Sequence, residues 1–175
     1  RGFRKGLAEW VKLLLAGHRL YIYGGSDAHG DMNRRRAIKI PLLAIGEDLD
    51  HIFGSVRTVV RAESSAGNDI VDAVRAGRAQ VTDGPFMEMR VMHNGDVYGI
   101  GDEITGGKFA VTLEAVSSPE FGSLRRLRLM VGRKSSGRED EVAVGGDFQG
   151  EYNFSGTFPV DGVDALYIRA ECETG

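Results

Sequence analysis

The segment Lys108–Val116, KFAVTLEAV, decides the fold class of the second half of this chain. Apolar and polar side chains alternate along it with the period of two that is typical of a half-buried β-strand. One face of that strand would carry Phe109, Val111, Leu113 and Ala115. The same period recurs in several neighbouring runs, with apolar faces formed by Leu127, Leu129 and Val131 and by Leu166, Ile168, Ala170 and Cys172.

Turn-forming dipeptides separate these alternating runs. Asn94-Gly95, Gly106-Gly107 and Asp161-Gly162 favour tight connections between antiparallel strands. No helical periodicity appears beyond Pro85. The sequence therefore predicts that residues 86–175 form an antiparallel β-sandwich of six to eight short strands.

The pattern before Pro85 is different. Apolar residues recur at helical spacing from Leu7 to Leu15, and Gly17 is placed to end that helix. A second helix is expected to begin at Ser64 or Ser65 as N-cap and to end at Gly77.

Short apolar runs lie between and after these predicted helices. Leu20–Tyr23, Val56–Val60 and Ala79–Thr82 read as strands, the first of them buried on both faces as in a parallel sheet. The stretch 30–54 between them reads as a long polar loop. The order of helices and strands predicts α/β architecture for residues 1–85, so the chain as a whole is expected to be α/β plus all-β.

Composition excludes several function classes. The 175 residues carry a net charge of −3, which gives no reason to expect a nucleic-acid partner, and no apolar stretch is long enough to span a bilayer. The chain has one cysteine, Cys172, so no intrachain disulfide can form. The single cysteine weakly favours a cytoplasmic location, but the sequence does not establish where the protein acts. The chain begins at Arg1 rather than at methionine, so it is expected to be the C-terminal part of a longer protein.

Asp27 and His29 stand out in the stretch YIYGGSDAHGDMNRRR, residues 21–36. A carboxylate and an imidazole two residues apart in extended backbone can face one site, and both are good ligands for Zn²⁺, Mn²⁺ or Fe²⁺. Two ligands are too few for a catalytic site, and the other histidines, His18, His51 and His93, show no ligand spacing. Taken alone, the pair is better explained as a hydrogen-bonded Asp–His pair at a turn, because such pairs are common and a single D-x-H is a weak metal signal.

The wider string changes this interpretation. GGSDAHGD at 24–31, followed by DAVRAGRAQVTDGP at 72–85 and a β-rich tail, resembles the PHP (polymerase and histidinol phosphatase) family of metal-dependent hydrolases. The closest likeness is to the carbaryl-hydrolase-like branch, which ends in a small β-sandwich. The resemblance covers essentially the whole chain and is most specific at Ser26–His29 and Gly77–Pro85.

This resemblance implies a fold and a chemistry. Residues 1–85 would be the last strands and helices of a distorted (β/α)₇ barrel, with the N-terminal half of the barrel missing from this chain. Asp27 and His29 would be the final ligands of a cluster of Zn, Mn or Fe ions in a phosphoesterase or ester hydrolase. A small anionic or ester substrate would meet Arg34 and, less directly, Arg57, because guanidinium groups match phosphate and carboxylate oxygens.

The absence of the family's earlier HxH motifs predicts that these 175 residues alone are inactive and bind metal weakly or not at all. Apolar faces left by the incomplete barrel would favour a homo-oligomer of the fragment. A different class of function is also open, a non-catalytic accessory module that recognises carbohydrate or protein. That hypothesis depends on an exposed aromatic surface, for which the candidates are Tyr98, Phe148, Tyr152 and Phe154.

Overall fold

The structure is a computed structural model of the 175-residue chain, and it describes residues 2–26, 37–40, 43–46, 56–143 and 148–175. Within these residues the chain forms two helices and eleven strands, and every strand pairing is antiparallel. In chain order the elements are α1 (Gly2–Leu15), β1 (Ala37–Ile40), β2 (Leu43–Gly46), β3 (Arg57–Val60), α2 (Gly67–Arg75), β4 (Ala79–Thr82), β5 (Phe86–His93), β6 (Asp96–Tyr98), β7 (Lys108–Val116), β8 (Leu124–Arg133), β9 (Arg138–Ala143), β10 (Asn153–Asp161) and β11 (Ala165–Thr174).

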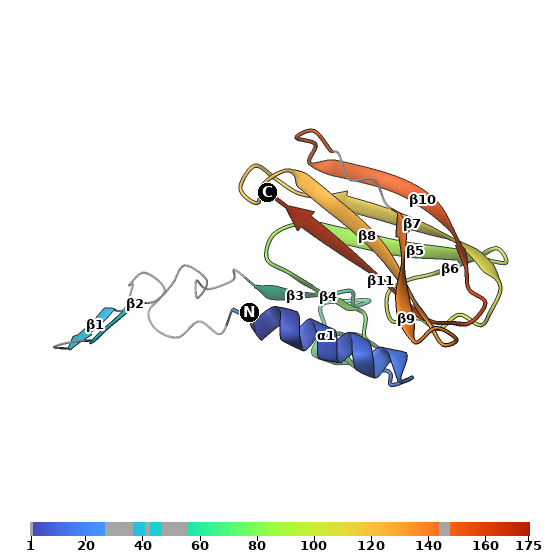
Figure 1. The fold of residues 1–175 in the computed structure, drawn as a ribbon, viewed down its shortest axis with the longest axis horizontal. Helices are drawn as coiled ribbons and strands as arrows, with labels where there is room; N and C mark the ends of the chain where they lie inside the picture. The colour runs from blue at the N-terminus through green and yellow to red at the C-terminus, as the bar shows by residue number, and fades with distance from the viewer. Residues whose placement is uncertain (1, 27–36, 41–42, 47–55, 144–147) are drawn as a thin grey trace.

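The seven strands from β5 to β11 form two sheets that pack face to face (Figure 1). One sheet has the order β10-β7-β5-β6 and the other has the order β11-β8-β9. The alternating apolar residues of both sheets meet in one core, formed by Val91, Phe109, Val111, Leu113, Ala115, Leu124, Leu127, Leu129, Val131 and Val160. The predicted antiparallel β-sandwich is confirmed, and its seven described strands lie within the expected number.

The predicted turns explain how consecutive strands reverse. Asn94 and Gly95 both have positive φ, at 52° and 92°, and they connect β5 to β6 at the pair His93–Asp96. Two central residues with positive φ define the type I′ hairpin turn, whose twist matches that of the flanking strands. The Asn-Gly signal in the sequence therefore corresponds to a tight hairpin.

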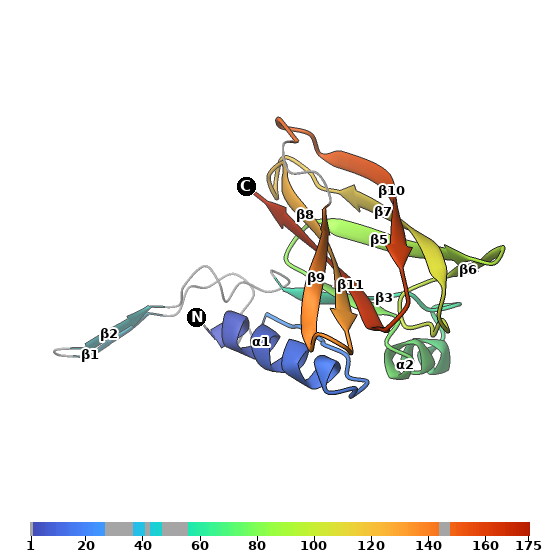
Figure 2. The same cartoon turned by 45° about the vertical axis from the view of Figure 1, so that its right-hand side comes forward.

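The elements α1, β3, α2 and β4 form a thinner N-terminal layer beside the sandwich (Figure 1). Helix α1 lies against β8 and β11, and α2 lies against β3 (Figure 2). Gly17, with φ of 86°, follows the end of α1, and Gly77, with φ of 73°, follows α2. Both predicted helix stops are therefore confirmed. No helix in the described ranges is long and apolar enough to cross a membrane.

The strand predicted over Leu20–Tyr23 is wrong. These residues form no strand, and Leu20 and Tyr23 are 41% and 47% exposed rather than buried on both faces. Side chains bond this backbone in place of a β-ladder: Trp10 Nε1 donates to Leu20 O, and the Thr58 hydroxyl bonds Gly24. The parallel arrangement expected for this region is not seen between the other predicted strands either, because β3 and β4 pair antiparallel.

Two further local predictions need correction. The stretch 30–54, expected to be a loop, contains strands β1 and β2, which pair antiparallel. Their apolar residues, such as Ile38 and Ile45, favour strand pairing. The N-cap of α2 is Ala66, not Ser64 or Ser65, and no side chain caps it. The Ser64 hydroxyl instead accepts a hydrogen bond from the Ala66 N–H and bonds Asp69, which satisfies the turn before the helix.

Candidate functional site

The segment that ends at Ser26 runs alongside β4 in the same direction as that strand. The ring of Tyr21 occupies the space that a side chain on Gly77, just before β4, would fill. Further along, an added Cβ on Gly24 would lie 2.5 Å from Cγ1 of Val81, close to the end of β4. Ser26 is therefore on the side of the molecule where β4 ends.

Four hydrogen bonds fix the path of this segment. The indole of Trp10 donates to Leu20 O at 3.0 Å, and the Tyr23 hydroxyl donates to the carbonyl of Val74 at 2.6 Å. Gly24 is held through both backbone groups: its N–H donates to Thr58 Oγ1 at 2.9 Å, and the same hydroxyl donates to its carbonyl at 2.9 Å. The backbone just before Asp27 is thus anchored to β3 and to α2.

The turn after β4 brings further functional groups to this end. The Gly84 N–H donates to Thr82 Oγ1 at 3.0 Å, which shapes the turn and leaves the Asp83 carboxylate exposed. Arg57, at the start of β3, donates to Gly84 O at 3.4 Å and stacks its guanidinium 5.5 Å from the centre of the Phe121 ring. A carboxylate and a guanidinium therefore lie near the point to which Ser26 leads.

Of the four site residues predicted from the sequence, Arg57 is the one that the structure describes. Asp27, His29 and Arg34 lie outside the described residues. Among the residues that are described, no group of three or more His, Cys, Asp or Glu side chains is arranged to hold a metal ion. A metal bound here would accordingly need ligands from Asp27, His29 or elsewhere.

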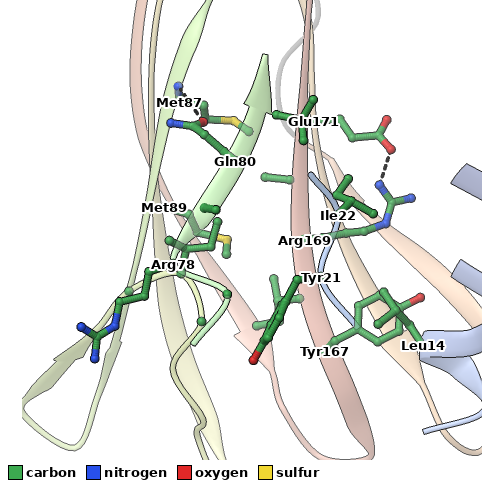
Figure 3. A pocket seen from close by; sticks show the side chains of 18 of the residues that line it. Leu14, Tyr21, Ile22, Arg78, Gln80, Met87, Met89, Tyr167, Arg169 and Glu171 are labelled. Atoms are coloured by element: carbon green, nitrogen blue, oxygen red, sulfur yellow. Dashed lines mark hydrogen bonds and ion pairs between the residues drawn. The ribbon is translucent and has the colours of Figure 1, made fainter. Parts of the chain in front are cut away.

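A cleft of about 2030 Å³ lies between the N-terminal layer and the sandwich. Figure 3 shows Ile22, Met87 and Met89 pointing into it, with Arg169 and Glu171 of β11 on another wall. Its size exceeds that of ordinary ligand cavities, which hold about 300–1,000 Å³. The volume leaves room for a substrate or for further polypeptide. Its walls are partly apolar and partly charged.

The β11 wall carries a nearly buried ion network. Arg169 donates to both oxygens of Glu139, at 2.5 and 2.6 Å, and Tyr167 donates to Glu139 at 2.9 Å. Burial and this carboxylate raise the pKa of Tyr167 above its ordinary value. Burial disfavours the charged form of Arg169, but its bonds to Glu139 and Glu171 outweigh that effect and raise its pKa. The guanidinium also lies 5.9 Å from the Trp10 ring, so the network joins the sandwich to α1.

The single cysteine is a poor nucleophile in this setting. Burial, followed by the negative charges of Asp83 and Glu173, raises the pKa of the Cys172 thiol to about 11. A thiol with that pKa is almost fully protonated at neutral pH, whereas reactive cysteines have lowered pKa values. The influence of the Asp83 charge on Cys172 also places the turn after β4 electrostatically close to β11.

The aromatic residues considered for carbohydrate recognition do not form a platform. Tyr98, Phe148, Tyr152 and Phe154 are all half-buried, and three of them pack against the sandwich core. The rings of Phe148 and Phe154 stand at 84° to one another, in an edge-to-face contact. A flat, exposed stacking surface would require nearly coplanar rings.

Sequence reasoning missed the network around Glu139 and Arg169. The signal was present as charged residues at alternate positions of β8, β9 and β11, opposite the apolar core positions. Charged residues opposite an apolar strand face ordinarily meet solvent, but α1 packs against β8 and β11 on this side of the sheet. Comparisons with protein-family models, with curated proteins and with solved structures found no match to this chain.

Proposed function

We propose that this chain supplies the last metal-ligand pair, Asp27 and His29, and an accessory β-sandwich to a metal-dependent hydrolase of the PHP type. One observation supports this proposal above the others: the segment ending at Ser26 is held parallel to β4 and leads to the end of that strand. Functional groups in α/β folds collect at the carboxyl ends of strands, and Arg57 and Asp83 lie at this end.

In this proposal Asp27 and His29 would each bind a metal ion, through a carboxylate oxygen and an imidazole nitrogen. The remaining ligands would come from the missing N-terminal part of the barrel. Bound Zn, Mn or Fe would supply Lewis-acid chemistry for hydrolysis of a phosphoester or ester. Arg34 and Arg57 would orient the anionic group of the substrate. Arg57 is suited to this role because Phe121 and Gly84 hold its side chain at the end of β4.

The test uses the complete protein that carries this chain. Asp27→Ala and His29→Ala are expected to lower metal affinity and the rate of hydrolysis of a model phosphodiester more than about 100-fold, since loss of even an outer partner of a metal ligand costs about 10–100-fold. Metal content by mass spectrometry and turnover after chelation provide the two readouts. Asp96→Ala, in the β5–β6 turn, and His18→Ala, at an exposed position, are matched controls.

The competing hypothesis is a non-catalytic accessory module. It predicts that the metal content and hydrolysis of the complete protein are the same in the Asp27 and His29 variants as in the controls. Turnover that survives chelation would also contradict the proposed function.

A further inference from the structure

A second, smaller cavity lies at the opposite end of the β3–β4 pair from Arg57. It has a volume of about 390 Å³, within the range of small-molecule sites. Its polar wall includes Arg61, which follows β3, Arg78, which precedes β4, and Tyr98 at the end of β6. Arg61 and Arg78 also line the large cleft, so the small cavity is a side chamber of that cleft.

The two arginines are direct cross-strand neighbours. The Arg61 N–H donates to Arg78 O at 2.8 Å, which extends the β3–β4 register by one pair beyond Val60 and Ala79. Residues opposite one another in an antiparallel pair project to the same face, with Cβ atoms about 5 Å apart, and like charges in that position are destabilising. The fold thus holds two positive charges together at the mouth of a cavity.

Neither arginine is neutralised by a close carboxylate in the described part of the chain. Arg61 has no ion pair there, and Arg78 has one at 3.9 Å, to a Glu63 side chain that is 86% exposed. Arg90, on the far wall of the cavity, differs because Glu114 binds it at 2.5 Å and Glu88 at 3.4 Å. Two guanidinium groups therefore keep their donors available.

Tyr98, Gly99 and Asp102 also contribute to the environment of this cavity. The Tyr98 hydroxyl has no hydrogen-bond partner among the described residues, while its ring packs against the core. Gly99 leaves space for the Arg61 guanidinium, because an added Cβ there would lie 2.7 Å from Arg61 Nη1. Asp102 also lines the cavity, and its carboxylate already accepts the Gly99 N–H at 2.7 Å.

We propose that Arg61, Arg78 and Tyr98 bind the phosphate group of a small phosphorylated molecule. Donors from two guanidinium forks and a phenol suit a tetrahedral oxyanion, whose three or four oxygens can accept from several directions. A planar carboxylate has two oxygens, and a single guanidinium fork satisfies it. The cavity is larger than a phosphate ion, so its remaining volume would take the organic part of the ligand.

The experiment titrates the protein with inorganic phosphate, glycerol phosphate and acetate at constant ionic strength, by calorimetry. One saturable site is expected for both phosphates, with glycerol phosphate binding more tightly, and at least about 10-fold weaker binding for acetate. Arg61→Gln and Arg78→Gln should each weaken phosphate binding about 10-fold or more. Either variant should fold as well as the parent protein, because each removes a like-charge repulsion.

Three variants separate specific binding from general charge attraction. Gly99→Ala leaves the net charge unchanged but displaces the Arg61 guanidinium, so it should weaken phosphate binding. Asp102→Asn removes a negative charge and should strengthen it. Arg138→Gln, at an exposed position on β9, should leave it unchanged. Absence of saturable phosphate binding, equal binding of acetate, or equal losses in the Arg61 and Arg138 variants would overturn the proposal.

Discussion

Gly77 shows how much of this fold rests on a single backbone position. Its φ of 73° is unfavourable for other residues, and an added Cβ would lie 2.1 Å from the Tyr21 ring. We expect Gly77→Ala to lower the free energy of unfolding by about 2–4 kcal/mol, because the backbone is strained and the Tyr21 ring is displaced.

Gly6→Ala is the control for this prediction, because nothing lies within 4 Å of that helical position. It should stabilise the protein by about 0.5–1 kcal/mol. Urea denaturation measures both, and equal effects would contradict the packing described for Tyr21.

Cys172 provides a residue-scale test of burial by pH. Its raised pKa means that the folded state favours the protonated thiol. The stability that this contributes is fully present below pH about 9 and is lost as the pH rises toward about 11. Alkylation of the native protein should therefore show a midpoint near pH 11, and alkylation in denaturant a midpoint near pH 9. A native midpoint at or below 9 would show that the thiol is solvated.

At the scale of elements, the junction between α1 and the sandwich depends on the pair Glu139–Arg169. Their side chains are 11% and 12% exposed, so Glu139→Ala leaves a guanidinium largely buried beside Trp10 and Tyr167. Breaking a buried pair on one side costs about 3–5 kcal/mol, and the partial exposure here and the remaining bond to Glu171 place the expected loss at about 2–3 kcal/mol.

A matched control for this prediction lies on the same sheet. Glu141 pairs with Arg126 at 3.3 Å, but the two side chains are 41% and 48% exposed. Glu141→Ala should therefore change the free energy of unfolding by less than about 1 kcal/mol. Thermal unfolding followed by circular dichroism compares the two variants. If both lose the same stability, the network does not hold α1 to the sandwich.

The elements that sequence reasoning placed correctly are those with a repeated signal. β7 and β8 have four and three apolar residues in strict alternation, and each of these residues is buried in the core. Leu166 was grouped with the buried face of β11 but is exposed, because it falls in a register shift between Ala165 and Tyr167. A shift of register has no counterpart in composition or period, since it depends on the partner strand.

For short apolar runs, the sequence alone does not decide whether a strand forms. Leu20–Tyr23 has the composition of a buried strand, yet Trp10 of α1 bonds the Leu20 carbonyl and Thr58 of β3 bonds Gly24 just beyond the run. Both side chains are distant from this run in the sequence. For the same reason, the sequence identifies Asp27 and His29 as residues able to bind a metal ion, but it does not identify Arg61 and Arg78 as neighbours. That pair arises from the register of β3 on β4, and nothing in the local sequence of either residue marks it.

At the scale of the whole molecule, the sandwich is well packed and the N-terminal layer is not. The sandwich has fully buried residues in both sheets, whereas Leu14 and Ala73 are the buried apolar residues described before β5. The large cleft lies between these two parts. The layer is therefore expected to be the less stable of the two, and amide exchange should be faster in α1 and α2 than in β7 and β8. Equal protection of helices and sandwich would contradict this difference.

Exposed apolar side chains near the end of α1 predict self-association. Leu13, at the end of α1, and Leu20, just beyond it, are about 40% exposed, and neighbouring Tyr23 is also exposed. Exposed apolar side chains that lie close together favour contact with another protein surface. Sedimentation should show concentration-dependent association of this chain, and the double variant Leu13→Glu and Leu20→Glu should shift it toward monomer. Val163→Glu is the control, because Val163 is 64% exposed in the turn between β10 and β11, within the sandwich. A strictly monomeric parent chain, or an equal response to the control substitution, would show that the N-terminal layer does not drive association.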